Sequence, residues 1–215
     1  LVDLSHAVRH GLVTYPGLPE PVVSEHLTRE GSRAHYAPGT EFQIGRIELV
    51  ANTGTYVDAP FHRFPQGADL ASLPLSSLVD LEGLVVSPGR SARAIGREVF
   101  EGLALARRAV LVHTGWDAHF GTPAYGVGHP FLTRAAAEYL VAARPALVGI
   151  DSLNIDDTAD GARPAHTLLL AAGIPICEHM TNLGALPAQG FRFHAAPVKI
   201  ERFGSFPVRA YAVLD

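Results

Sequence analysis

Glycine and proline are spread along the whole chain, and they limit the length of every regular element. The 215 residues include 21 glycines and 16 prolines, with no stretch that gathers them into a low-complexity block. Both residues end helices and interrupt strands, so they predict many short elements separated by turns. No internal repeat of about 20–50 residues is visible. The chain length then favours one domain over residues 1–215.

Short apolar runs alternate with amphipathic segments through the middle of the chain. The apolar runs are rich in β-branched residues, as buried strands are, and they predict four strands: 83–87, 109–113, 146–150 and 174–178. Pro175 would push the last strand toward a sheet edge or a bulge. The amphipathic segments predict helices over 95–105, 134–143 and 164–172. Thr133 is a good N-cap for the second helix.

Both ends of the chain are expected to add strands. Residues 40–50 alternate apolar and polar side chains, with a slip at Gly45–Arg46 that indicates a bulge. Residues 198–202 and 208–214 predict a terminal hairpin around a turn at 203–205. Since strands and helices alternate in the middle, the expected fold is a mixed α/β domain whose sheet is not purely parallel.

The charge balance excludes several kinds of partner. Lysine and arginine number 17 and aspartate and glutamate 21, and no basic run occurs, so no nucleic acid or anionic membrane is expected to bind. Apolar stretches such as Thr167–Cys177 are far shorter than the roughly 20 residues of a membrane span. Cys177 is the only cysteine, which excludes an internal disulfide or a CxxC zinc ribbon. With no signal-peptide pattern, we expect a soluble, cytoplasmic protein that acts on a small molecule.

One polar segment follows directly on the strand at 40–50. It places Asn52, Tyr56, Asp58 and His62 at spacings of four, two and four. On extended backbone Tyr56 and Asp58 point to the same side, and an aspartate and a histidine fixed there could serve as metal ligand and proton shuttle. The alternative is an ordinary turn in which Asp58 caps a backbone amide and His62 is exposed. From spacing alone this alternative is the commoner one.

A second group of polar residues lies near the predicted strand at 174–178. Glu178 ends that apolar strand, and a buried glutamate needs a cation, a proton donor or a metal. His166 on the preceding helix could belong to the same site, while an ion pair to an arginine is the alternative for Glu178. The acidic loop at 156–160 is either solvated or caps the helix that starts at Pro164.

Other motifs add no candidate. The remaining histidines have no spacing that singles them out, so we expect a structural or surface position for each: His113, His119, His129 and His179. The chain contains no GxGxxG, Walker, GxSxG or HExxH sequence.

The segment NTGTYVDAPFH resembles the signature HxGTHxDxPxH of the cyclase family. These metal-dependent hydrolases include the arylformamidases (kynurenine formamidases). Further stretches follow in the family's order along nearly the whole chain: Asp3–His6 with Tyr15–Gly17, Val112–Trp116, His129–Pro130, Val148–Ser152, His166 with Leu169–Leu170, Glu178–Leu183, Pro197–Ile200 and Val208–Ala210.

The resemblance implies a fold, an assembly and an activity. The fold would be an α/β domain with a barrel-like, swivelling mixed sheet flanked by helices, assembled as a homodimer or homotetramer. The activity would be hydrolysis of a C–N amide bond (EC 3.5.1 class). Its substrate would be an N-formyl arylamine such as N-formylkynurenine, on the route of tryptophan catabolism to kynurenine, or a related cyclic amide.

The resemblance also assigns roles to residues. It makes Asp58, His166 and Glu178 metal ligands and His62 the acid/base group. Asn52 and Tyr56 stand where the family has two ligand histidines. An amide oxygen is a weak ligand, and a phenol must first lose a proton with a pKa of about 10. We therefore expect one divalent zinc or manganese ion per chain at most, with Asn52 as a weak ligand.

Further expectations concern the substrate. Tyr56 could donate a hydrogen bond to the tetrahedral oxyanion, and Tyr15 and Trp116 are candidate aromatic walls. Leu18 replaces a common acidic residue of the family, which changes the expected substrate preference. Two alternatives stay open: an enzyme of this fold with altered or metal-free chemistry on a lactone or an enol, or a non-catalytic protein that binds a small molecule.

Overall fold

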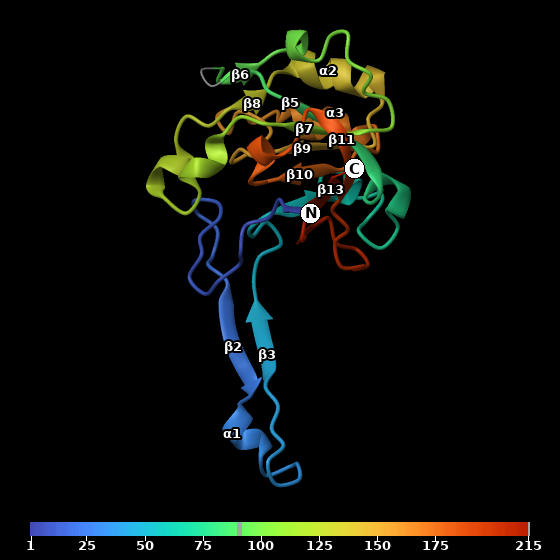
Figure 1. Cartoon of the computed structure of the whole chain (residues 1–215). Helices are drawn as coiled ribbons and strands as arrows, with labels where there is room; N and C mark the ends of the chain where they lie inside the picture. The colour runs from blue at the N-terminus through green and yellow to red at the C-terminus, as the bar shows by residue number, and fades with distance from the viewer. Residues whose placement is uncertain (90–91, 215) are drawn as a thin grey trace.

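The computed structural model describes residues 1–89 and 92–214 (Figure 1). A curled, nine-stranded sheet forms its body, in the order β1-β13-β11-β5-β7-β9-β10-β4-β12. The central pairs β5–β7, β7–β9 and β9–β10 are parallel, and the outer pairs are antiparallel. The mixed α/β prediction is confirmed.

The elements are short, as the distribution of glycine and proline predicts. The strands of the large sheet are β1 (Val2–Asp3), β4 (Tyr56–Asp58), β5 (Leu81–Val86), β7 (Ala109–Val112), β9 (Leu147–Ile150), β10 (Ile176–Glu178), β11 (Gln189–His194), β12 (Ser205–Pro207) and β13 (Tyr211–Leu214). Two small ribbons pair β2 (Val22–Leu27) with β3 (Ile44–Glu48) and β6 (Ala94–Ile95) with β8 (Phe131–Leu132). The α-helices are α1 (Arg29–Ser32), α2 (Arg134–Ala143) and α3 (Pro164–Ala171).

Short 3-10 turns connect several of these elements. They are η1 (Pro60–His62), η2 (Leu75–Ser77), η3 (Arg97–Val99), η4 (Trp116–His119), η5 (Pro123–Gly126) and η6 (Leu183–Ala185). Among the described residues, none of the helices combines the length and hydropathy that crossing a membrane requires.

The sheet buries a core on each face. Helices α2 and α3 pack side by side over one face, where Val110, Val148 and Ile176 meet Leu140 and Leu169 (Figure 1). The opposite face buries a second cluster, which includes Val57, Leu111, Cys177, Phe191 and Phe193. Side chains alternate along each strand, so neighbouring residues of β4 and β10 serve different cores.

Helix α2 forms where local signals agree. The Thr133 hydroxyl accepts a hydrogen bond from the Ala136 amide at 3.2 Å, and Arg144 ends the helix in the left-handed region ahead of Pro145. Its buried face includes Leu140. Helix α3 also forms where local signals agree, since it begins at Pro164 and is followed by Gly173 at φ +76°. Both helix predictions are confirmed to within one residue.

The helix predicted over 95–105 is wrong. Ile95 pairs with Leu132 in the β6–β8 ribbon, and only η3 is helical in this segment. Gly96 is extended, and Gly102 has φ +77°. These glycines leave too few residues between them for a stable helix. The apolar residues of the segment, such as Ile95 and Phe100, are buried without forming one face of a helix.

Two strand predictions also need correction. The terminal hairpin over 198–214 does not form, because β12 pairs with β4 while β13 pairs with β1 and β11. The strand after Pro175 lies inside the sheet, between β9 and β4, and not at an edge. Pro175 precedes the first paired residue, and its carbonyl accepts a hydrogen bond from Val148, so the missing N–H costs the ladder nothing.

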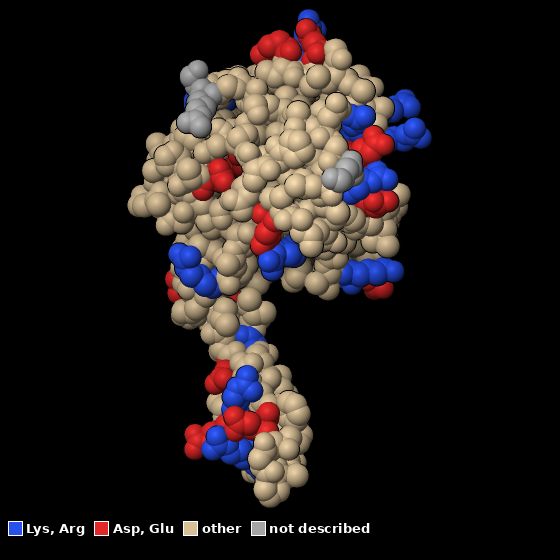
Figure 2. All heavy atoms as spheres, in the orientation of Figure 1, with Lys and Arg blue, Asp and Glu red and all other residues tan. Residues whose placement is uncertain are grey.

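The strand predicted over 40–50 exists, but it lies outside the body. Strands β2 and β3 form an arm that projects away from the large sheet, with α1 near its end (Figure 1). All of β3 is exposed, including Ile44 and Ile47. The predicted bulge at Gly45–Arg46 is misplaced, because the extra residue lies in β2, opposite Ile44–Gly45. Figure 2 shows acidic and basic side chains interspersed along this arm.

Candidate active site

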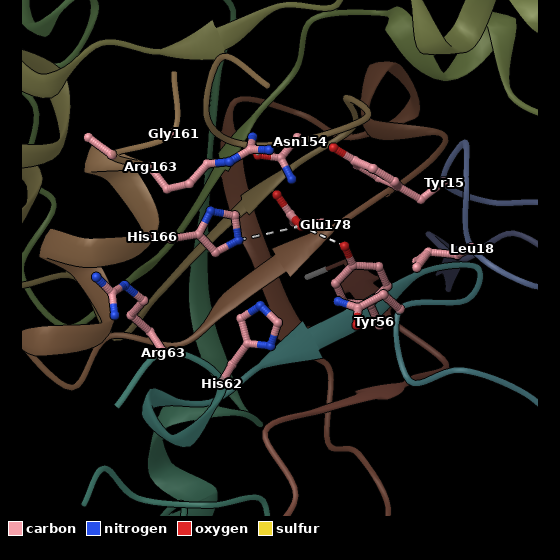
Figure 3. A pocket seen from close by; sticks show the side chains of 12 residues that line it. Tyr15, Leu18, Tyr56, His62, Arg63, Asn154, Gly161, Arg163, His166 and Glu178 are labelled. Atoms are coloured by element: carbon pink, nitrogen blue, oxygen red, sulfur yellow. Dashed lines mark hydrogen bonds and ion pairs between the residues drawn. The ribbon is translucent and has the colours of Figure 1, made fainter. Parts of the chain in front are cut away.

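A cavity of about 500 Å³ opens on the helix-covered side of β4 and β10 (Figure 3). Its lining comes from distant parts of the chain: Tyr15, Leu18, Asn52, Tyr56, His62, Arg63, Asn154, Gly161, Ala162, Arg163, His166 and Glu178. The cavity joins the two groups of polar residues that the sequence contains near 52–62 and 166–178.

Strand register explains why these groups meet. Glu178 pairs with Tyr56, and both Ile176 and Ser205 pair with Asp58. Paired residues of antiparallel strands lie on the same face, and alternate residues of one strand share a face. Tyr56 and Asp58 therefore point to the same side, as predicted, together with Glu178 and Ser205.

Glu178 is fully buried and has three polar neighbours. Its Oε2 accepts a hydrogen bond from the Tyr56 hydroxyl at 2.7 Å, and its Oε1 accepts one from the Ile155 amide at 2.6 Å. His166 Nε2 lies 3.7 Å from Oε2. Burial raises the pKa of Glu178, but the charge and hydrogen bond of His166 outweigh it and lower this pKa to about 2. No arginine pairs with Glu178 in the described part of the chain, so that alternative is wrong.

His166 is held at the start of α3 by Asp156. The Asp156 carboxylate accepts hydrogen bonds from the Ala165 amide at 2.6 Å and the His166 amide at 3.0 Å, and it lies 2.7 Å from His166 Nδ1. The capping interpretation of the acidic loop is thus confirmed at Asp156. Because Nδ1 is occupied, Nε2 faces the cavity. Burial lowers the pKa of His166, but nearby acids led by Glu178 raise it well above its usual value.

Asp58 links His62 to His166. Its Oδ1 accepts a hydrogen bond from the Ser205 hydroxyl, and this hydroxyl lies 2.9 Å from His62 Nδ1. Its Oδ2 is buried without a hydrogen-bond donor among the described residues and lies 3.6 Å from His166 Nε2. A buried carboxylate oxygen without a donor is costly unless a cation faces it.

The donor atoms fit a divalent cation. His166 Nε2 lies 3.6 Å from Asp58 Oδ2 and 3.7 Å from Glu178 Oε2. Ligands about 2.1 Å from a tetrahedral zinc ion are separated by about 3.4 Å, close to these spacings. The His62 side chain also offers an atom, since Asp58, His62 and His166 have ligand atoms within 4.8 Å of one another. One nitrogen and two carboxylate oxygens suit zinc or manganese.

Tyr56 does not replace the family's histidine as a ligand. Its side chain is buried, and its hydroxyl donates to Glu178. Burial and the Glu178 charge raise the Tyr56 pKa well above its usual value, so the phenol keeps its proton. Asn52 lines the cavity nearby. The site thus contains a group of donor atoms that could hold a metal ion, and the Tyr56 hydroxyl is not one of them.

Restoring both histidines is expected to restore a second site. The double change Asn52→His and Tyr56→His should raise the bound metal from at most one ion per chain toward two, because neutral imidazole is a better ligand than an amide or a phenol. Elemental analysis after dialysis measures the stoichiometry, and Asn52→His alone is the matched control. Two tightly held ions in the unchanged chain would contradict this expectation.

The two predicted aromatic walls lie in different places. Tyr15 lines the cavity, with Leu18 beside it (Figure 3). Trp116 is not among the lining residues. Its indole N–H donates to the Tyr125 carbonyl at 3.0 Å, and its side chain lines another cavity, near His113. The structure therefore does not bring Trp116 to the site.

Several site residues were missed because no local pattern marks them. Ser205 reaches Asp58 only through the pairing of β12 with β4, and Asn154 and Arg163 lie in a loop over the cavity. Two other histidines are buried inside the protein, as a structural position requires: His129 Nε2 lies 3.0 Å from the Asp156 carbonyl, and His179 Nδ1 lies 2.9 Å from the Tyr125 hydroxyl.

The chain is similar to known proteins over most of its length. The model of the family described as "Putative cyclase" matches residues 2–157. The kynurenine formamidase of Paracidovorax citrulli is 26% identical over 221 residues, which cover 98% of this chain and 94% of that protein. The kynurenine formamidase of Salinibacter ruber is 28% identical over 214 residues, with 98% and 95% covered.

Solved structures share the fold. A potential metal-dependent hydrolase with cyclase activity superposes with a TM-score of 0.77 at 25% identity, covering 97% of this chain and 94% of that one. Isatin hydrolase A from Labrenzia aggregata gives a TM-score of 0.82 at 23% identity, with 99% and 93% covered. The barrel-like mixed sheet implied by the sequence resemblance is confirmed.

Proposed function

This chain belongs to the cyclase family, and from that premise we propose that it is a metal-dependent amide hydrolase whose substrate is an N-formyl arylamine. One observation carries the proposal: His166 Nε2, at the start of α3, lies 3.6 Å from an Asp58 carboxylate oxygen on β4 and 3.7 Å from a Glu178 carboxylate oxygen on β10. The two kynurenine formamidases that resemble the chain over nearly its full length support the substrate class.

Glu178 and His166 line the proposed reacting end of the cavity, and the buried Asp58 lies 3.6 Å from His166. Asp58, His166 and Glu178 would hold the cation. The Ser205 hydroxyl orients Asp58, and the Asp156 carboxylate orients His166. When bound there, a divalent cation supplies Lewis-acid chemistry, polarising a carbonyl oxygen and lowering the pKa of water. Hydrogen bonds to ligand side chains of this kind fix their orientation and protonation.

His62 is the group placed to move a proton. Its Nδ1 is 2.9 Å from the Ser205 hydroxyl, and its side chain is 36% exposed at the cavity. With Nδ1 engaged, Nε2 can accept a proton from the attacking water and deliver it to the leaving nitrogen. Hydrolysis then gives formate and the free arylamine.

Tyr56 acts on Glu178 rather than on the substrate. Its single hydroxyl proton is donated to Glu178 Oε2, so donation to a developing oxyanion would require this bond to break. We therefore assign Tyr56 to positioning the carboxylate.

One observation favours a second candidate. His166 lies between two carboxylates, and its pKa is raised, so a protonated His166 could neutralise them without a metal. The cavity would then carry acid/base chemistry on a lactone or an enol.

Metal removal separates the two candidates. Dialysis against a chelator is expected to abolish hydrolysis of formanilide, the simplest N-formyl arylamine, and added zinc or manganese should restore it. Full activity in the chelator would favour the metal-free candidate. If the metal-loaded protein does not hydrolyse any N-formyl arylamine, the proposed substrate class is wrong.

A further inference from the structure

A second cavity, of about 450 Å³, opens at the carboxyl ends of β5 and β7, and no described residue lines both it and the candidate active site. The register that pairs Val86 with Val112 brings these two strand ends together. Ser87 follows β5 and His113 follows β7. Ligands of α/β proteins commonly bind at the carboxyl ends of parallel strands, and this volume lies in the usual range for a small molecule. The place and the size of the cavity therefore suit a small ligand.

The turn that follows β7 forms a fixed wall of this second cavity. The buried Asp151 carboxylate accepts hydrogen bonds from the Thr114 amide at 2.7 Å, the Thr114 hydroxyl at 2.6 Å and the Gly115 amide at 2.9 Å. Gly115 has φ 75°, in the left-handed region that glycine adopts without strain. The turn places Trp116 on the wall, where its indole N–H donates to the Tyr125 carbonyl at 3.0 Å. Because this N–H is occupied, Trp116 offers a ligand the surface of its ring.

Two polar side chains of the second cavity are left for a ligand. Ser87 Oγ lies 3.5 Å from His113 Nδ1, at the outer limit of a hydrogen bond, and neither side chain has another hydrogen-bond partner among residues 1–89 and 92–214. The opposite edge of the His113 ring packs against η6, where a Cβ on Gly184 would come within 3.0 Å of Cε1 and 3.2 Å of Nε2. Nδ1 is therefore the nitrogen that lies near Ser87 and is open to a ligand.

The composition of the lining indicates an uncharged ligand. The described residues that line the second cavity include no lysine, arginine, aspartate or glutamate. An ionised group would thus lose part of its hydration there without gaining an ion pair. An imidazole nitrogen and a hydroxyl can both accept a hydrogen bond, and an indole ring packs well against another planar ring. A neutral aromatic molecule with an O–H group meets both conditions.

We propose that the second cavity binds an uncharged phenol, whose ring packs against Trp116 and whose hydroxyl donates to His113 Nδ1, with Ser87 beside it. This binding site is separate from the proposed hydrolysis, so either can fail without the other. The chain contains one tryptophan, and therefore the tryptophan fluorescence of the protein reports on this cavity.

The test follows the fluorescence of Trp116 as phenol, anisole or benzoate is added. Anisole keeps the ring and the oxygen but has no O–H, and benzoate is charged. The emission is expected to change saturably with phenol, which should bind about 3–10-fold more tightly than anisole, the usual effect of one hydrogen bond, and more tightly than benzoate. His113→Phe should bring the ratio of phenol to anisole affinity near one, and Ser87→Ala should lower it less. The control, His26→Phe on the exposed strand β2, should leave it unchanged.

A change in emission that is linear in phenol would overturn the proposal, as would equal affinity for phenol and anisole or tighter binding of benzoate. A crystal of the unchanged protein soaked with 4-bromophenol covers the case in which His113→Phe folds poorly. The anomalous signal of bromine is expected in the second cavity, beside Trp116. No bromine peak, or bromine bound only in the candidate active site or elsewhere, would also overturn the phenol site.

Discussion

Replacing His62 with alanine is expected to lower kcat for an N-formyl arylamine by about 10²–10⁴-fold, the usual effect of losing a general acid/base. The bound metal should stay at its original level. The reason is geometric: Ser205 holds His62 Nδ1 at 2.9 Å, and the same hydroxyl is bound to Asp58, so His62 is oriented through Ser205. Its side chain is the exposed member of the cluster, at 36%, while Asp58 is fully buried.

Paired kinetics and elemental analysis distinguish three roles for His62. Loss of kcat with full metal content supports the proton shuttle. Loss of both would make His62 a ligand, which its place in the Asp58–His62–His166 group allows. Activity at the original level would remove it from the mechanism. His119→Ala, at the end of η4 and away from this cavity, is the matched control and should change neither quantity.

Replacing Glu178 with glutamine is expected to have the largest effect. The amide keeps the size of the side chain but removes the charge, so metal binding should be lost and kcat/KM should fall by about 10³-fold or more. Folding should survive, because the amide oxygen can still accept one of the bonds from Tyr56 and Ile155.

Metal content, kinetics and thermal unfolding of Glu178→Gln test this together. The control is Glu82→Gln on β5, an exposed glutamate paired with Arg108 at 3.3 Å, which should behave like the unchanged protein. A Glu178→Gln protein with full metal and near-normal kcat/KM would show that the carboxylate is structural.

Capping and helix-breaking residues predicted the two longer helices correctly. Thr133 and Pro145 bracket α2, and Pro164 and Gly173 bracket α3, so both helices could be placed from sequence. The errors lie where pairing between distant segments decides. Nothing within 198–214 shows that β12 joins β4, because that choice depends on a strand about 150 residues earlier. The alternation in β3 correctly indicated a strand but not that it lies in an exposed arm.

The candidate site could also be predicted only in part from the sequence. A glutamate at the end of an apolar strand must have a partner, and from this requirement and the family resemblance we predicted Asp58, His166 and Glu178 as site residues. The hydrogen-bond partners of those residues could not be predicted from the sequence, since Ser205 reaches Asp58 only through the register of β12 with β4. Arg163 could not be placed over the cavity before the loop was folded. The homodimer or homotetramer implied by the resemblance stays a prediction.

The cation site is tested most directly by a crystal structure of the protein grown with manganese, in which anomalous scattering locates the ion. We expect one peak per chain, enclosed by Asp58, His166 and Glu178. A second peak of equal height beside Asn52, or an ion bound away from all three ligands, would contradict it.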